Sequence, residues 1–174
     1  MTVFYPDSVG TQGRDTWLFV PTATNKALIT VAEATATGSC ALQNAIRPGF
    51  GADASTEQVN DERQGALVTY SQIGTTTVSL TDMILIDRPQ DAALAATRKH
   101  LDVLAPGASG LLVNRRGIGS AVENWVAPAA GQRYIAYPVS VSPQVAQAPS
   151  DTKGFERKVT FAVTGAVVEG AFAA

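Results

Sequence analysis

The sequence has few of the residues on which most enzyme and metal sites are built. It contains one cysteine, Cys40, and one histidine, His100, among 174 residues. A single cysteine excludes a disulfide within the chain and a metal cluster built on cysteine. Neither residue falls on a strand-to-helix turn that would expose a nucleophile. We therefore interpret them as a buried thiol and a surface imidazole.

Charge and long apolar runs are also scarce. Charged residues make up 16% of the chain, and the net charge is −2. Without a polybasic face, tight binding to nucleic acid is not indicated. No apolar run reaches the roughly 18 residues of a membrane span, and the N-terminus lacks the regions of a signal peptide. A surface with so little charge favours an assembled state.

No motif for metal, phosphate or acid–base chemistry is present. Asp53, Glu57, Asp61 and Glu62 surround one segment, but they lack the Asp-x-Asp-x-Asp-Gly frame of a calcium loop. The glycine-rich stretches are not followed by the Lys-Ser/Thr of a phosphate-binding loop. We therefore expect no enzyme activity, no metal and no cofactor.

One helix organises the expected fold. Asp87 and Gln90 have capping-box spacing, Pro89 fits the first turn, and an alanine-rich segment follows. Pro106 and Gly107 end the pattern, so we predict a single amphipathic helix near residues 88–105. Its expected core-facing residues are Leu94, Leu101 and Leu104.

The rest of the chain has the pattern of β-structure, with about seven to nine strands. The expected strands are 16–20, 28–37, 40–47, 66–72, 75–86, 110–116, 133–145 and 155–172. Segments 66–72 and 75–86 read as a hairpin that turns at Gly74. Pro138 and Pro143 indicate a bent or edge strand, and Gly165 marks a bend. We predict a mainly β domain, a sandwich or half-barrel flanked by the helix.

Two segments of this single expected domain, 1–174, lack a regular pattern. Residues 1–26 form an N-terminal arm, whose aromatic residues either dock on a neighbouring copy or fold back on their own core. Residues 48–61 form a long loop, which is uncommon in compact domains without a functional role. The candidates in this loop for contacts between subunits are Phe50, Asp53 and Glu57.

Two stretches of the sequence are similar to a known family. IDRPQDAALAATRKHLDVLAPGASGLLVNRRG resembles the helix–turn–strand signature of major tail tube proteins of long-tailed bacteriophages, especially those of actinobacterial hosts. KGFERKVTFAVTGAVVEG resembles the last strand of the same family, and YIAYPVSV before it also fits. The resemblance covers residues 84–170, while residues 1–83 fit in strand order only.

The resemblance implies a structural virion protein, made in the bacterial cytoplasm and assembled into the phage tail. Six subunits would close a ring, and stacked rings would form a tube around a channel. The implied partners are the protein itself, the tape-measure protein, the tail terminator and distal tail proteins, and DNA in transit without sequence-specific binding. No membrane is involved.

A tube that conducts DNA should not hold it. Contacts between basic side chains and phosphates release counterions and add affinity, so a neutral or acidic wall is expected. Segments 28–37 and 75–86 are rich in Thr, Ser and Ala and contain no Lys or Arg. We therefore predict that both line the channel. The channel-lining candidates are Glu33, Thr75, Thr77, Ser79, Thr81 and Asp82.

Two alternatives remain open. A tail terminator or a secretion-tube ring protein with the same fold would stop at one ring instead of growing into a filament. A monomeric β-sandwich that binds carbohydrate would need aromatic side chains together on one face, for which Trp17 and Trp125 are the candidates.

Overall fold

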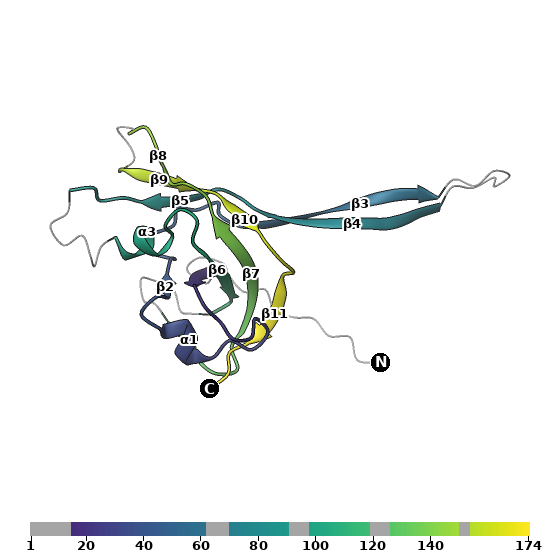
Figure 1. The fold of residues 1–174 in the computed structure, drawn as a ribbon, viewed down its shortest axis with the longest axis horizontal. Helices are drawn as coiled ribbons and strands as arrows, with labels where there is room; N and C mark the ends of the chain where they lie inside the picture. Colours follow the sequence, from purple (N-terminus) through teal and green to yellow (C-terminus); the bar gives the residue numbers. More distant parts are fainter. Residues whose placement is uncertain (1–14, 62–69, 91–97, 119–125, 150–153) are drawn as a thin grey trace.

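The computed structural model of the protein describes residues 15–61, 70–90, 98–118, 126–149 and 154–174. These residues form eleven strands in three sheets and contain two short helices. The predicted mainly β class is therefore confirmed. The described part consists of a body and a two-stranded ribbon that projects from it (Figure 1).

The main sheet forms the centre of the body. Its strands run in the order β10-β7-β6-β1-β2, and β11 pairs with β7 beside β10. All of these pairings are antiparallel. The strands are β1 (Asp15–Val20), β2 (Cys40–Ala41), β6 (Ser109–Arg116), β7 (Arg133–Val141), β10 (Phe161–Val163) and β11 (Val168–Ala171).

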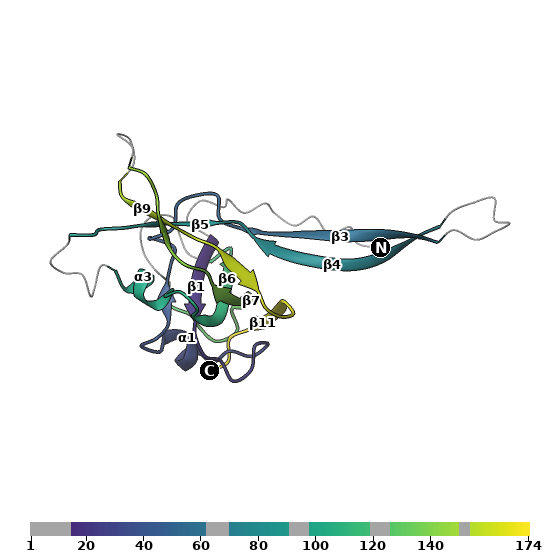
Figure 2. The same cartoon turned by 45° about the horizontal axis from the view of Figure 1, so that its top comes forward.

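Two smaller sheets complete the architecture. β3 (Ala52–Asp61) and β4 (Tyr70–Leu80) pair only with each other among the described strands, and they form the ribbon. β5 (Met83–Ile86) pairs with β9 (Glu156–Val159), which also pairs with β8 (Val145–Ala146). Both views show the ribbon at one end of the long axis and the β5–β9–β8 sheet towards the other (Figures 1 and 2).

Both faces of the main sheet are buried, and alternate side chains of β1 show this. Trp17 and Phe19 point into one core cluster, which also contains Leu101 and Leu104. Leu18 and Val20 point into a second cluster on the opposite face. The aromatic residues of β1 therefore fold onto their own core, one of the two alternatives that the sequence left open.

The helix α1 (Val31–Thr35) replaces the strand predicted at 28–37, so that prediction is wrong. Thr30 caps the helix, because its side chain accepts a hydrogen bond from the Glu33 N–H while the Glu33 carboxylate accepts from the Thr30 N–H. This capping box satisfies two N–H groups that would otherwise lack partners. It outweighs the weak β-preference of the neighbouring Val and Thr residues.

The predicted helix near 88–105 is seen in its last part as α3 (Lys99–Val103). Leu101 and Leu104 are buried, as expected. Leu94 lies outside the described residues. The expectation of a single helix is wrong, because α1 is a second one.

The strand predicted at 75–86 is divided between two strands, β4 and β5. The predicted hairpin of this segment with segment 66–72 is wrong. Thr81 and Asp82 separate β4 from β5. Gly74 does not turn the chain but lies within β4, beside a β-bulge opposite Glu57. β4 pairs with β3, whereas β5 pairs with β9, more than 60 residues later in the chain.

Three other predicted strands are shorter or divided, namely 40–47, 133–145 (which is β7, ending at Val141) and 155–172. The strand expected at 40–47 is only β2. The last strand breaks into β9, β10 and β11, and Gly165 lies at the bend between β10 and β11. β6 follows its prediction closely.

Pro138 lies in the interior of the main sheet rather than at an edge. Its carbonyl accepts a hydrogen bond from the Thr164 N–H, so the side of β7 on which Pro138 lacks an N–H faces the gap between β10 and β11. Because the ladder is interrupted there, the missing donor breaks no strand pairing.

We expect Leu101→Ala to destabilise the body. Leu101 is 3% exposed and packs in the first core cluster, so truncation leaves a cavity. The loss should be about 2–5 kcal/mol in the free energy of unfolding, measured by urea denaturation. An unchanged midpoint would mean that α3 does not anchor this face of the sheet.

We expect the stability given by Glu33 to depend on pH. Hydrogen bonds from the Thr30 and Thr24 N–H groups lower the pKa of Glu33 to about 2. A lowered folded-state pKa means that the contribution is present above the unfolded value of about 4.3 and is lost as pH falls towards 2. Because Glu33 lies near the surface, Glu33→Gln should cost only about 1 kcal/mol at pH 7. In urea titrations, this difference should shrink below pH ~4; a difference independent of pH would contradict it.

Candidate assembly surfaces

The ribbon is the most prominent surface feature, and its strands bury little. Ten residues of β3 and eleven of β4 extend for about 30 Å. Near the body, Ala52 pairs with Leu80 and Ala54 with Val78, and this face continues the first core cluster. The loop predicted over residues 48–61 is therefore largely a strand. The segment lacks an apolar alternation because most of its side chains are exposed and pack on no described element of the body.

The opposite face of the ribbon is polar. Asp53 pairs with Ser79 and Ser55 with Thr77, and all four are exposed. Thr77 and Ser79 thus lie on the outward face, while Val78 and Leu80 face the core, as their alternation predicted. Thr75, at the bulge, is also exposed. Neither β3 nor β4 contains Lys or Arg.

The root of the ribbon is fixed to the body. The Phe50 ring lies 4.7 Å from that of Trp17 and 5.9 Å from that of Phe161, measured between centroids. Thr81 and Gly51 exchange hydrogen bonds, with the Thr81 hydroxyl accepting from the Gly51 N–H at 2.8 Å. Phe50 thus packs within its own chain, and its contact with a neighbouring subunit stays a prediction.

The two acidic channel candidates lie in different places. Asp82 follows β4, accepts hydrogen bonds from Lys158 at 3.1 Å and from Thr160 at 2.7 Å, and remains exposed. These bonds, from Thr160 first, lower its pKa. Glu33 is the cap of α1, on the body rather than in a sheet. The structure therefore does not bring Glu33 and Asp82 together.

A buried carboxylate joins the start of the predicted helix to β9. Asp87 accepts a hydrogen bond from Arg157 at 2.7 Å and lies 3.6 Å from Arg98. Asp87 was expected to cap the helix, but the described contacts make it a partner of two arginines. Because Asp87 forms an ion pair with each arginine, we interpret this cluster as structural.

Sequence reasoning did not identify Arg115 as a core residue. Its side chain is fully buried, with hydrogen bonds to the Gln132 side chain and the Val126 carbonyl. Burial lowers the pKa of its guanidinium. The available signal was the position of Arg115 in a strand that is buried on both faces. However, the sequence Arg115-Arg116-Gly117 is equally typical of a solvent-exposed strand end.

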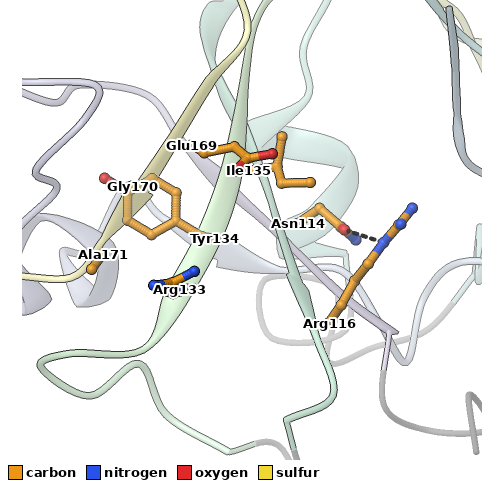
Figure 3. A pocket seen from close by; sticks show the side chains of 8 residues that line it. All are labelled: Asn114, Arg116, Arg133, Tyr134, Ile135, Glu169, Gly170 and Ala171. Atoms are coloured by element: carbon orange, nitrogen blue, oxygen red, sulfur yellow. Dashed lines mark hydrogen bonds between the residues drawn. The ribbon is translucent and has the colours of Figure 1, made fainter. Parts of the chain in front are cut away.

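One open hollow lies at the end of the main sheet, across β6, β7 and β11 (Figure 3). Its charged residues are Arg116, Arg133 and Glu169, and Arg116 donates to the Asn114 side chain at 3.0 Å. We call it the sheet-end hollow. With both signs of charge and no nucleophile–base pair, it suits a polar contact rather than catalysis.

A second hollow lies between β2, the end of β5 and the start of α3. We call it the basic hollow; it is lined by Cys40, Ala41, Asn44, Ala45, Ile86, Arg88, Lys99 and His100. The His100 ring donates from Nε2 to the Ile86 carbonyl at 2.8 Å. Cys40 is buried, and burial raises the pKa of its thiol while the nearby Lys99 charge opposes the rise.

The described residues offer no alternative chemistry. Within them, no group of three His, Cys, Asp or Glu side chains is placed to hold a metal ion. No helix in the same residues has the length and apolar character needed to cross a membrane. Trp17 is buried and Trp125 lies outside the described residues, so an aromatic carbohydrate platform gains no support.

The described residues form a mainly β body that carries a two-stranded ribbon with a polar outward face. The model of a family described as phage tail tube protein matches residues 2–174. The chain therefore belongs to the phage tail tube protein family and is a structural component of the virion tail, where such proteins associate with themselves and with other tail components. No curated protein matches it. The more specific resemblance, to tail tube proteins of long-tailed phages with actinobacterial hosts, stays a prediction.

Proposed function

We propose that six copies close a ring and that rings stack into the tail tube, with the ribbon on the wall of the channel. The channel holds the tape-measure protein and later conducts DNA. The tail terminator and distal tail proteins cap its ends. The observation that carries this proposal is the projecting ribbon.

The ribbon leaves two long strand edges without partners among the described strands. Such edges recruit other strands and cause aggregation unless they are paired or covered. A closed barrel formed by ribbons from several copies would pair every edge. Ring closure therefore solves a problem that an isolated subunit would have.

The chemistry of the ribbon suits a channel wall. Its outward face carries Asp53, Ser55, Thr77 and Ser79, and the ribbon strands lack basic residues. Basic side chains that contact phosphates release counterions and so add affinity for DNA. Because the ribbon strands have no such side chains, DNA would pass along this wall without being held. Thr75 and Thr81, both exposed, stay channel-lining candidates at the two ends of this face. Asp82 stays a candidate whose charge is paired with Lys158. Glu33 lies in α1 instead of in the predicted strand 28–37. We therefore do not propose it as a channel-lining residue.

A terminator or secretion-tube ring protein remains the alternative within the same fold, and it differs in where growth stops. The purified protein, examined by negative-stain microscopy and sedimentation, should form tubes whose length increases with protein concentration. Single rings at all concentrations would favour the terminator, and a monomer would contradict both.

A further inference from the structure

The basic hollow lies on the body, away from the ribbon. Both views place α3 and the outer end of β5 towards one end of the long axis, and β3 and β4 towards the other (Figures 1 and 2). The hollow has a volume of about 570 Å³. Hollows of this size hold small organic molecules in many proteins. The basic hollow is therefore a candidate ligand site that is separate from the channel wall proposed for the ribbon.

Basic side chains from two segments of the chain line this hollow. Arg88 follows β5, and Lys99 and His100 begin α3. Among the described residues, no acidic side chain lines the hollow. Positive charges gathered around one hollow raise the local electrostatic potential, which attracts anions.

The two described acidic residues close in sequence to these groups are placed elsewhere. Asp87 forms ion pairs with Arg98 and Arg157, at 3.6 and 2.7 Å. Asp102 of α3 is exposed and does not line the hollow. Neither carboxylate therefore supplies the anion that the hollow attracts.

Contacts of the fold hold the basic groups in place. The His100 ring donates from Nε2 to the Ile86 carbonyl at 2.8 Å, which fixes its orientation. The Lys99 charge acts on the Cys40 thiol, where it opposes the rise in pKa that burial causes. Because Lys99 is on α3 and Cys40 on β2, a ligand in the hollow between these elements would meet the lysine charge.

The hollow also presents apolar surface. Ala41, Ala45 and Ile86 line it together with the Asn44 amide. A phosphate monoester carries a charge of about −1.5 to −2 at pH 7 and three strong acceptor oxygens. A carboxylate has a single charge and suits the planar fork of one arginine, whereas lysine binds phosphate as a point charge. Basic groups beside an apolar surface therefore fit a small organic phosphate better than a carboxylate.

We propose that the basic hollow binds a small organic phosphate monoester, with the phosphate against Lys99 and His100 and the organic part against Ala45 and Ile86. This site goes beyond the proposed function and does not depend on tube formation. Its ligand would connect β2, the end of β5 and α3, and would stabilise the folded body by mass action.

Isothermal titration calorimetry of the whole chain with phenyl phosphate tests this site. The wild type should bind one molecule per chain, with a Kd of about 1 mM or tighter. Lys99→Gln should weaken binding about tenfold, because it removes a charge-assisted contact. Lys99→Arg, which keeps the charge, should bind within about threefold of the wild type. Lys26→Gln, which removes an exposed lysine outside the hollow, is the matched control and should bind as the wild type does.

Three competing probes identify what the hollow recognises. Inorganic phosphate should displace phenyl phosphate, but more weakly, because it lacks the organic part. Phenol, which lacks the phosphate, should not displace it. A single-stranded oligonucleotide without a terminal phosphate carries only phosphodiesters, each with one negative charge, and should not displace it either.

Several results would overturn the proposal. These are the absence of saturable binding, unchanged binding by Lys99→Gln, equal losses in Lys99→Gln and Lys26→Gln, or no recovery in Lys99→Arg. Displacement by phenol would exclude recognition of an anion, and displacement by the oligonucleotide would make the hollow a phosphodiester surface instead. Each of these results leaves the proposed tube untouched, because tube formation is measured separately and without phosphate.

Discussion

Replacing residues 55–77 by Asn-Gly is expected to leave a folded body that no longer forms tubes. The new turn joins Ala54 to Val78, which already face each other across the ribbon. An Asn-Gly pair suits the two-residue hairpin that this connection needs. The side chains of Ala52, Val78 and Leu80, which contribute to the first core cluster, are all kept.

Stability and assembly should separate in this variant. The removed segment contributes no residue to either described core cluster, so the midpoint of urea unfolding should change by less than about 1 kcal/mol. Sedimentation should show a monomer at concentrations where the wild type forms tubes. Tubes of normal length from the shortened protein would exclude the ribbon as an assembly element.

Trp17→Ala is expected to reduce both stability and assembly. Trp17 is 4% exposed and packs against Phe50 at the root of the ribbon and against Tyr137, at 4.7 and 5.8 Å between ring centroids. Removing the indole should cost about 3–5 kcal/mol in the free energy of unfolding. It also removes the surface that orients the ribbon, so tube yield should fall at temperatures where the variant remains folded.

Leu18→Ala is the matched control for this effect. Leu18 is equally buried but faces the second core cluster, away from the ribbon root. Its truncation should cost about 2–5 kcal/mol without changing the orientation of the ribbon. Equal losses of tube yield in both variants, once compared at equal folded fraction, would show that stability alone limits assembly.

The sequence predicted β6 and the buried leucines of α3, because turn residues and residue spacing within one segment determine them. Gly110–Arg116 was expected as a strand and is β6 almost residue for residue, because glycines bound an apolar run at both ends. Leu101 and Leu104 were placed in the core from helical spacing alone. α1 was missed although Thr30 and Glu33 have capping-box spacing, since the threonines around them suggested a strand.

Non-local pairing could not be predicted in the same way. β3 looked like a loop because a ribbon outside the body buries too little for its sequence to alternate. The pairing of Met83 with Val159 joins segments that are distant in the chain, and no local pattern selects that partner. The basic hollow likewise combines β2, β5 and α3, so its charges gather only in the folded chain.

A cryo-electron microscopy map of the assembled tube tests the central claim most directly. The account predicts that β3 and β4 line the channel, with Asp53, Ser55, Thr77 and Ser79 towards the lumen. A map with both strands on the outer surface, or with Lys and Arg dominating the channel wall, would contradict it.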